Sequence, residues 1–335
     1  MVRIAVLGCG RIGVMHAANI AAHPRARLAA VQDINRVAAE AVAASTGAPV
    51  MESAADIFAS QDVDAVLIAT ATDTHADLLE QAVAAGKPVL CEKPIDLSLA
   101  RVNRCAAAIR GVTLPIQIGF VRRFDPGHKA VHDAVQAGEL GDLHQVIVTS
   151  RDPGFASEAY LATSGGIFRD MTIHDFDMAR YILGEEPLEV FATGSRLAAP
   201  ALMEKLGDHD TVTVVMKTAS GKQAIITNSR DAAYGYDQRV EAFGTRGMAV
   251  SENRRPHHMT LAGKGFTGRS APLLHFFIER YREAFDVEIA AFVEAVEAGR
   301  PAVVSFEDGR LALVLAEAAQ KSVVEGRIVK VTEVE

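Results

Sequence analysis

Three side chains could carry out acid–base chemistry, and two of them lie together in residues 165–184. Read as a helix, this segment places Asp170 and His174 on one face, which Asp177 and Tyr181 continue. An imidazole that titrates near neutral pH can remove a hydroxyl proton, and a carboxylate one turn away can orient it or bind the substrate. The alternatives are a solvated helix face with an i,i+4 pair, or a metal site, for which the pair supplies too few ligands. No metal is expected.

The third side chain is Lys93, which follows an apolar run predicted as a strand at residues 88–91. In an open parallel sheet the carboxyl ends of the strands face the ligand, so Lys93 is expected at that edge. Its ammonium group could stabilise the alkoxide that develops as hydride leaves a carbinol carbon. The alternative is a lysine that ends the strand and pairs with Glu92.

A glycine-rich loop near the start of the sequence predicts a dinucleotide site. Gly8, Gly10 and Gly13 have the spacing GxGxxG, directly after an apolar run and before a helical stretch. The first turn of that helix, which includes Arg11 and Ile12, would offer backbone N–H groups to a pyrophosphate. Asp33 ends the second apolar run, where a carboxylate binds the ribose diol of NAD and repels the additional phosphate of NADP. NAD is therefore the expected cofactor, although Asn35 and Arg36 leave slow use of NADP open.

The elements that must position these groups change in type along the chain. Up to residue 120, apolar runs alternate with helical stretches, which predicts a doubly wound parallel sheet of the Rossmann type. The predicted strands of this domain are residues 2–7, 28–32, a short one near 50, 63–70, 88–91 and 115–119. Residues 121–335 form the second predicted domain, of α+β class with a large, mostly antiparallel sheet. Its predicted strands are residues 144–151, 188–197, 210–218, 223–231, 238–244 and 248–252, and its long helices are 274–298 and 306–325. Residues 263–272 are predicted to be a mobile loop.

Composition limits the classes of partner. The chain has 335 residues, a formal net charge of −8 and a hydrophobic fraction of 49%. The acidic balance argues against nucleic acid and against an anionic membrane surface. No apolar run is long enough to span a bilayer, and no basic-then-apolar leader precedes the first strand, so a cytoplasmic protein is expected. The cysteines Cys9, Cys91 and Cys105 have no metal-binding spacing and are expected to be reduced thiols.

These motifs together resemble the family of glucose-fructose oxidoreductase, inositol dehydrogenase and MocA-type oxidoreductases. The resemblance covers almost the whole chain and includes the glycine fingerprint, Glu92-Lys93-Pro94 and the Asp170-x-x-x-His174 helix. Further segments, residues 70–75, 119–126, 150–153 and 234–237, look like the inositol 2-dehydrogenase branch. The stretch after Pro153 departs from the proline-rich loop of many such enzymes.

The resemblance implies a catalytic triad of Lys93, Asp170 and His174. It also implies cofactor contacts from Thr70, His75 and Glu92. The residues implied to bind substrate, besides the triad, are Arg123, Asp152 and Tyr236.

The expected activity is NAD-dependent oxidation of a cyclic polyol, with myo-inositol oxidised to 2-keto-myo-inositol as the first choice. Another inositol isomer or a sugar, an NAD-dependent glycosidase on the same fold and a redox-inactive NAD sensor are the alternatives. The predicted sheet would leave one apolar face uncovered, so a symmetric homo-oligomer, a tetramer, is expected.

Overall fold

The computed structural model describes residues 1–335, which form two compact units. The first unit is Met1–Val121 with Glu283–Leu313, and the second is Arg122–Arg282 with Val314–Glu335. This differs from the expected division, which assigned every residue after 120 to the second domain. Helix α11 (Arg282–Ala298) explains the difference, because Ile289, Phe292 and Val293 are buried in the core of the first unit. An amphipathic helix packs wherever a complementary apolar surface exists, whatever its place in the sequence.

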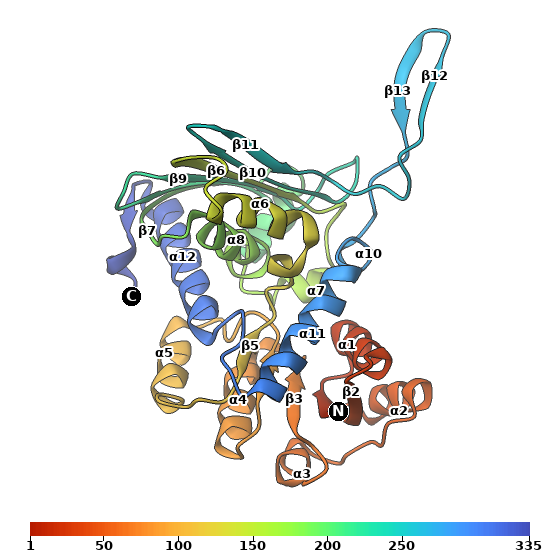
Figure 1. Ribbon diagram of the computed structural model, residues 1–335. Helices are drawn as coiled ribbons and strands as arrows, with labels where there is room; N and C mark the ends of the chain where they lie inside the picture. The colour runs from red at the N-terminus through yellow and green to blue at the C-terminus, as the bar shows by residue number, and fades with distance from the viewer. The chain divides into compact units, whose positions relative to one another are not determined.

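The first unit contains a parallel sheet in the strand order β2-β1-β3-β4-β5, as the alternation of strand and helix predicted (Figure 1). Its strands are β1 Val2–Leu7, β2 Ala26–Gln32, β3 Ala65–Ile68, β4 Val89–Cys91 and β5 Ile116–Ile118. Its helices are α1 Arg11–Ala22, α2 Arg36–Thr46, α3 Ala54–Ala59, α4 His75–Ala84, α5 Leu99–Ala108 and α11. The short helix η1 spans Thr72–Thr74.

The strand expected near residue 50 is absent. Val50 makes only an isolated bridge to Val31. The bridge lies between Gly47, which ends α2 in the left-handed region, and Ser53, which caps α3.

The second unit contains a seven-stranded sheet in the order β11-β10-β6-β9-β8-β7-β14. Strands β6 and β9 are parallel and the other neighbours are antiparallel, which confirms a mostly antiparallel sheet. Its strands are β6 Leu143–Arg151, β7 Pro187–Ser195, β8 Thr211–Thr218, β9 Gln223–Ser229, β10 Asp237–Gly244, β11 Gly247–Ser251 and β14 Val329–Lys330. Helices α6 (Pro126–Gln136) and α8 (Ile173–Leu183) pack on one face, against β6, β9, β10 and β11.

Helix α12 spans Phe306–Glu325, the bounds that the sequence predicts. Its last turns belong to the second unit. There Ser322 Oγ accepts a hydrogen bond from the Ala192 backbone N–H. The remaining short elements are α7 Glu158–Leu161, α9 Pro200–Leu206, α10 Phe277–Arg280, η2 Val121–Phe124, η3 Phe168–Thr172 and η4 Val331–Glu333. The helix expected over 274–298 is thus two helices, α10 and α11. None of the helices is both long enough and apolar enough to cross a membrane.

A two-stranded hairpin extends from the second unit (Figure 1). It consists of β12 (Thr260–Gly263) and β13 (Phe266–Ser270), and every residue in both strands is exposed. The predicted loop over 263–272 is therefore half of an antiparallel hairpin.

Candidate active site

The glycine loop is shaped by close backbone contacts on two sides and by open space between them. Gly8 has φ +93°, and a Cβ there would lie 2.4 Å from the carbonyl oxygen of Ala69. A Cβ on Gly13 would lie 1.9 Å from the carbonyl oxygen of Gly8, whereas one on Gly10 would meet nothing within 4 Å. The loop therefore leaves room beside Gly10, at the N-terminus of α1, which begins with Arg11 and Ile12. This arrangement fits a pyrophosphate bound to backbone N–H groups.

Asp33 lies just after β2 and next to the same loop. Its Oδ2 accepts a hydrogen bond of 2.6 Å from the Cys9 backbone N–H, and its Oδ1 accepts one of 2.7 Å from Asn35. The carboxylate is therefore fixed beside the glycine loop, as a ribose-binding acid requires. The Arg36 guanidinium is engaged with Glu40 at 2.8 Å and Glu52 at 2.7 Å.

The other predicted cofactor contacts lie in the segments that follow β3 and β4, at the carboxyl edge of the parallel sheet. His75 is 2% exposed, and its ring nitrogens lie 2.8 Å from the carbonyl oxygen of Pro94 and 3.1 Å from that of Thr70. His75 thus links the segment after β3 to the segment that carries Lys93. Glu92 lies 2.8 Å from His16, and its other oxygen accepts a hydrogen bond of 3.3 Å from the Lys93 backbone N–H.

In the second unit, Asp170 lies on a π-helical turn, η3, rather than on a regular α-helix. Such wider turns are rare and occur frequently at functional sites. Asp170 accepts hydrogen bonds from the Tyr160 hydroxyl at 2.7 Å and from Arg230 at 3.0 Å. His174 is half-buried at the start of α8. The expected helix face therefore begins with Asp170 on a π-helical turn and continues with His174 on an α-helix.

The other residues expected on this helix face, Asp177 and Tyr181, take part in an ion pair and in ring stacking. Asp177 is buried and forms a two-point ion pair with Arg123, whose Nε lies 2.8 Å from Asp177 Oδ2. The Arg123 guanidinium stacks over the Tyr181 ring at 4.8 Å, and Tyr181 stacks on His132 with ring centroids 3.7 Å apart. Arg123 therefore packs against Asp177 and Tyr181 of α8. Its assignment as a polyol contact stays a prediction.

The neighbouring arginine, Arg122, faces the predicted substrate residues instead. It is hydrogen-bonded to Asp175 and, at 2.8 Å, to Ser150. Burial and the negative charge of Asp170 raise the pKa of Asp152 to about 6, while the positive charges of Arg122 and Arg230 act to lower it. Asp152, Asp170, Arg122 and Arg230 thus share one electrostatic environment.

Tyr236 belongs to this environment as well. It is 5% exposed, its ring packs edge-on against Tyr281 at 6.2 Å, and burial raises its pKa well above the ordinary tyrosine value. Sequence reasoning missed Arg122, Tyr160, Arg230 and Tyr281. Two of them carried a signal: Arg122 lies in residues 119–126, which resemble the inositol branch, and Arg230 lies at the carboxyl end of the strand predicted over 223–231.

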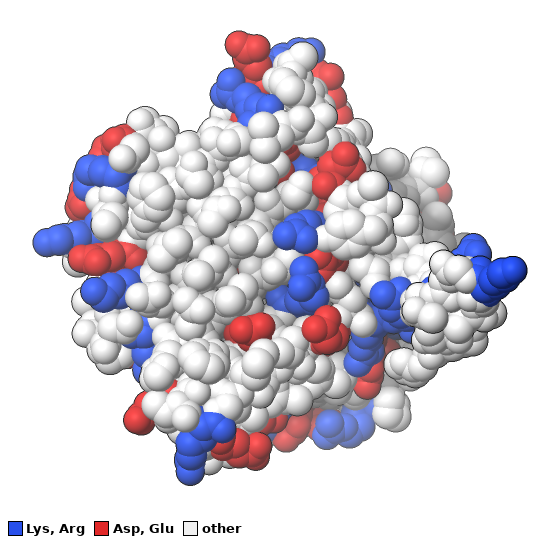
Figure 2. All heavy atoms as spheres, turned by 90° about the horizontal axis from the view of Figure 1, so that it is seen from above, with Lys and Arg blue, Asp and Glu red and all other residues white.

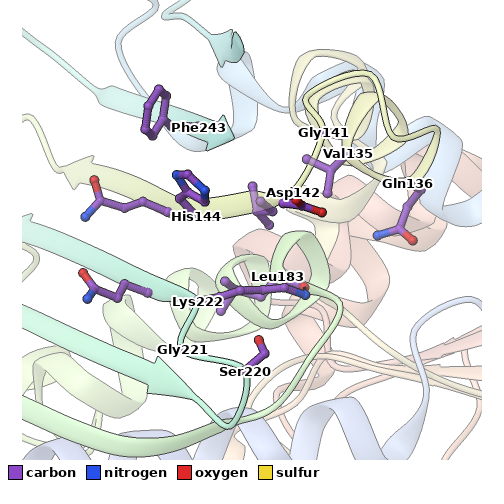
Figure 3. Close-up of a pocket in the computed structure, with 13 residues that line it drawn as sticks. Val135, Gln136, Gly141, Asp142, His144, Leu183, Ser220, Gly221, Lys222 and Phe243 are labelled. Carbon is purple, nitrogen blue, oxygen red and sulfur yellow. Dashed lines mark hydrogen bonds between the residues drawn. The ribbon is translucent and has the colours of Figure 1, made fainter. Parts of the chain in front are cut away.

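A separate cavity of about 800 Å³ opens elsewhere in the second unit (Figure 3). Its lining includes His144 at the start of β6, Ser220 and Lys222 in the β8–β9 turn, and Phe243 on β10. None of the predicted site residues lines it.

The glycine loop with its acid, the lysine after β4 and the acid–histidine pair on a separate unit define a nicotinamide-dependent oxidoreductase as the class of protein. Residues 2–120 match the oxidoreductase family with an NAD-binding Rossmann fold, and residues 128–250 match the GFO/IDH/MocA C-terminal domain. The chain belongs to the GFO/IDH/MocA family of oxidoreductases, and its cofactor is NAD.

Relatives and solved structures agree with this assignment over nearly the whole length. The chain is 49% identical over 331 residues to an inositol 2-dehydrogenase of Rhizobium meliloti, covering 98% of this chain and 99% of the relative. A myo-inositol dehydrogenase structure from Corynebacterium glutamicum is 42% identical, with a TM-score of 0.95 and coverage of 98% of each chain. A scyllo-inositol dehydrogenase from Lactobacillus casei, solved with NAD(H) and scyllo-inositol, is 32% identical, with a TM-score of 0.92 and coverage of 99% of each chain.

Proposed function

We propose that this protein oxidises a cyclic polyol with NAD⁺, and that its substrate is myo-inositol, converted to 2-keto-myo-inositol. The observation that carries the proposal is the shared environment of Asp152, Asp170, Arg122 and Arg230 in the second unit. A set that contains both acceptors and donors suits a ligand covered with hydroxyl groups. The relatives named as inositol dehydrogenases favour the same substrate class.

In this proposal Lys93, Asp170 and His174 act on one substrate molecule. His174 removes the proton of the reacting hydroxyl, and Asp170 orients the substrate or the imidazole. Lys93 stabilises the negative charge that develops on the oxygen. Bound NAD⁺ supplies the hydride acceptor, so the alcohol carbon loses a hydride and its hydroxyl loses a proton.

Tyr160 and Arg230 support this chemistry by holding Asp170. The phenol hydroxyl and the guanidinium both donate to its carboxylate, at 2.7 Å and 3.0 Å, which fixes the orientation of the acid. A catalytic group held in a productive geometry lowers the entropy cost of reaching the transition state.

The substrate is tested by a spectrophotometric screen of NAD⁺ reduction with myo-, scyllo- and chiro-inositol and with aldoses. We expect the highest kcat/KM with myo-inositol. A higher value with another isomer or an aldose would reassign the substrate, and turnover of an aryl glycoside without net NADH would indicate the glycosidase alternative. Binding of NAD without turnover of any of these compounds would indicate a redox-inactive NAD sensor.

We also propose that the protein is a cytoplasmic homotetramer. The sheet of the second unit exposes large apolar side chains on the face opposite α6 and α8, and Figure 2 shows a broad area of this face with few charges. These side chains, between 38% and 54% exposed, are Leu188, Phe191, Val215, Phe243, Met248 and Val250. An apolar patch that crosses several strands suits a self-complementary contact with a second copy. Reduced, buried Cys9, Cys91 and Cys105 suit a reducing compartment.

A further inference from the structure

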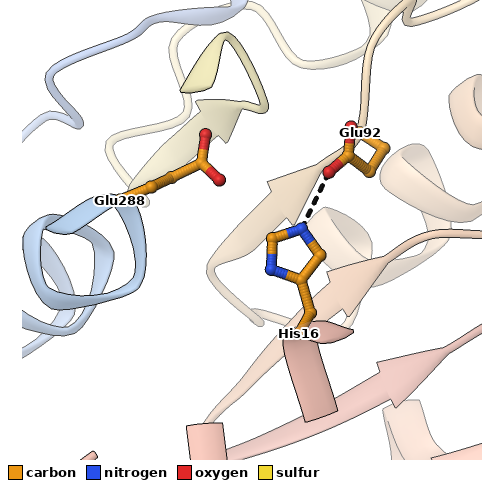
Figure 4. Close-up of side chains that lie close together, drawn as sticks. All are labelled: His16, Glu92 and Glu288. Atoms are coloured by element: carbon orange, nitrogen blue, oxygen red, sulfur yellow. Dashed lines mark hydrogen bonds and ion pairs between the residues drawn. The ribbon is translucent and has the colours of Figure 1, made fainter. Parts of the chain in front are cut away.

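Glu288 is a buried acid that the proposed mechanism does not use. It lies on α11 and faces His16 of α1 and Glu92, which follows β4, so that ligand atoms of the three side chains lie within 4.8 Å of one another (Figure 4). Glu288 and His16 are both 0% exposed. The cluster therefore joins the helix of the glycine loop, the strand that delivers Lys93 and α11, all within the first unit.

The hydrogen bonds in this cluster are unevenly distributed. His16 Nε2 and Glu92 Oε1 are 2.8 Å apart, and Glu92 Oε2 accepts the Lys93 backbone N–H at 3.3 Å. Both carboxyl oxygens of Glu288 are buried and have no hydrogen-bond partner in the protein. An ionised carboxylate without donors is costly to bury, and the nearby Glu92 charge adds repulsion. Burial and Glu92 accordingly raise the pKa of Glu288 well above its ordinary value.

We propose that Glu288 is held as a neutral carboxylic acid and acts as a positioning residue for Lys93. Its hydroxyl proton is directed to the Glu92–His16 pair, across a separation that one buried water molecule or a small side-chain rotation closes. The neutral acid thereby fixes the Glu92 carboxylate, and Glu92 fixes the backbone of Lys93. This inference rests on the proposed function only for the measurements of kcat, which need a substrate that the enzyme oxidises.

A proton accounts for this cluster better than a metal ion does. One histidine and two carboxylates are a donor set that zinc accepts. Here, however, His16 Nε2 already faces Glu92, and a Glu92 oxygen already accepts the Lys93 backbone N–H. A cation bound through His16 Nε2 and Glu92 Oε1 would have to displace their 2.8 Å contact, whereas a proton on Glu288 leaves that contact in place.

The test compares Glu288→Gln with Glu288→Leu. An amide has the shape of a protonated carboxyl group and also carries donor hydrogens, so Glu288→Gln should keep kcat within about threefold of the unchanged enzyme. Leucine cannot donate to Glu92, so Glu288→Leu should lower kcat by roughly 10- to 100-fold through displacement of Lys93. The dissociation constant for NAD, measured by calorimetry, should change by less than about threefold in Glu288→Gln, because the amide keeps Glu92 in place. Glu294→Gln, on the exposed side of the same helix, is the matched control.

Two readouts do not depend on turnover. Difference infrared spectroscopy near neutral pH should show a protonated carboxyl band that disappears in Glu288→Gln. Acylation of Lys93 with acetic anhydride, followed by mass spectrometry, should change in rate in Glu288→Leu and not in Glu288→Gln. If no polyol is oxidised, the proposed function fails while these two measurements still decide the role of Glu288.

Four outcomes would overturn the inference. Equal damage by glutamine and leucine would mean that the ionised carboxylate is required. A missing infrared band would show that Glu288 is not a neutral acid. Unchanged Lys93 acylation in Glu288→Leu would show that Glu288 does not position Lys93. Stoichiometric metal in the purified enzyme, with activity lost to a chelator and restored by zinc, would assign the cluster to a cation instead.

Discussion

The hydroxyl of Tyr160 donates a hydrogen bond of 2.7 Å to Oδ1 of Asp170. Tyr160 comes from the short helix α7 and Asp170 from the π-helical turn η3, so the contact ties together two irregular segments of the second unit. Arg230 donates to the other oxygen of the same carboxylate. The acid proposed for catalysis is therefore held from two sides, and each support can be removed separately.

Removing the phenol hydroxyl should loosen Asp170 without removing it. Hydrogen bonds to charged groups contribute roughly 1.5–3 kcal/mol, so Tyr160→Phe should lower kcat/KM for the best polyol by about tenfold or more. Tyr234→Phe is the matched control, because its hydroxyl bonds a different acid, Asp237, at 2.5 Å. Steady-state kinetics that show equal losses in both variants would contradict the specific role of Tyr160.

Loss of Lys93 or His174 should affect turnover far more than cofactor binding. Lys93→Met and His174→Ala should each lower kcat by roughly two to four orders of magnitude, in line with oxyanion and acid–base contributions. The double variant should lose much less than the product of the two, because both residues serve one proton-transfer step. Calorimetry should show nearly unchanged NAD affinity. Near-normal turnover in either single variant would remove that residue from the catalytic set.

Asp33 should determine the preference for NAD over NADP. Its carboxylate is fixed beside the glycine loop by Cys9 and Asn35, so it can bind a ribose diol and repel a 2′-phosphate. Asp33→Ala should lower the ratio of kcat/KM for NAD to that for NADP, chiefly through weaker NAD binding. Equal kcat/KM values for the two cofactors in the unchanged enzyme would contradict this role.

Asp152 should give substrate binding a pH dependence centred near pH 6. Its pKa is raised to about 6, so the side chain is neutral below that pH and becomes an acceptor of substrate hydroxyl hydrogen bonds above it. The KM for polyol should therefore fall as pH rises through 6. Asp152→Asn should remove this step from the KM profile. A step of the same size in Asp152→Asn would assign the titration to another group.

The same ionisation should affect stability with the opposite sign. An acid whose folded pKa is raised to about 6 favours the folded state below the unfolded pKa, and this contribution is lost as pH rises through 6. Between about pH 4 and pH 7 the free energy of unfolding should fall relative to Asp152→Asn by an amount on the order of 2 kcal/mol. Urea titrations at several pH values measure this difference.

A charge among the apolar side chains of the open sheet face should break the oligomer. Phe191 on β7 is 39% exposed among the apolar side chains of that face, so Phe191→Glu should shift the protein toward monomers at micromolar concentration. Val37→Glu, on α2 of the first unit and 74% exposed, is the control and should leave the mass unchanged. Light scattering distinguishes the two. A monomeric unchanged protein would overturn the proposed tetramer.

Features that depend on local spacing could be predicted from the amino-acid sequence. The glycine fingerprint, the alternation of strands and helices over residues 1–120 apart from the strand expected near residue 50, and the bounds of α12 follow from patterns within a few residues of one another. Six of the seven strands in the sheet of the second unit were also predicted, because segments such as β8 alternate between buried and exposed residues. The two-residue strand β14 was not predicted.

The tertiary structure alone decided what depends on contacts between distant segments. Arg122 and Arg123 are chemically equivalent neighbours, and only the positions of Asp175 and Asp177 separate their roles. The π-helical turn at Asp170 departs from the regular helical spacing that the sequence pattern implied. Glu288 was invisible as a candidate, because its environment is made by His16 and Glu92, which lie far away in the sequence. Periodicity reports which face of an element is buried, whereas the partners that bury it, and the charges they bring, are fixed only when the chain folds.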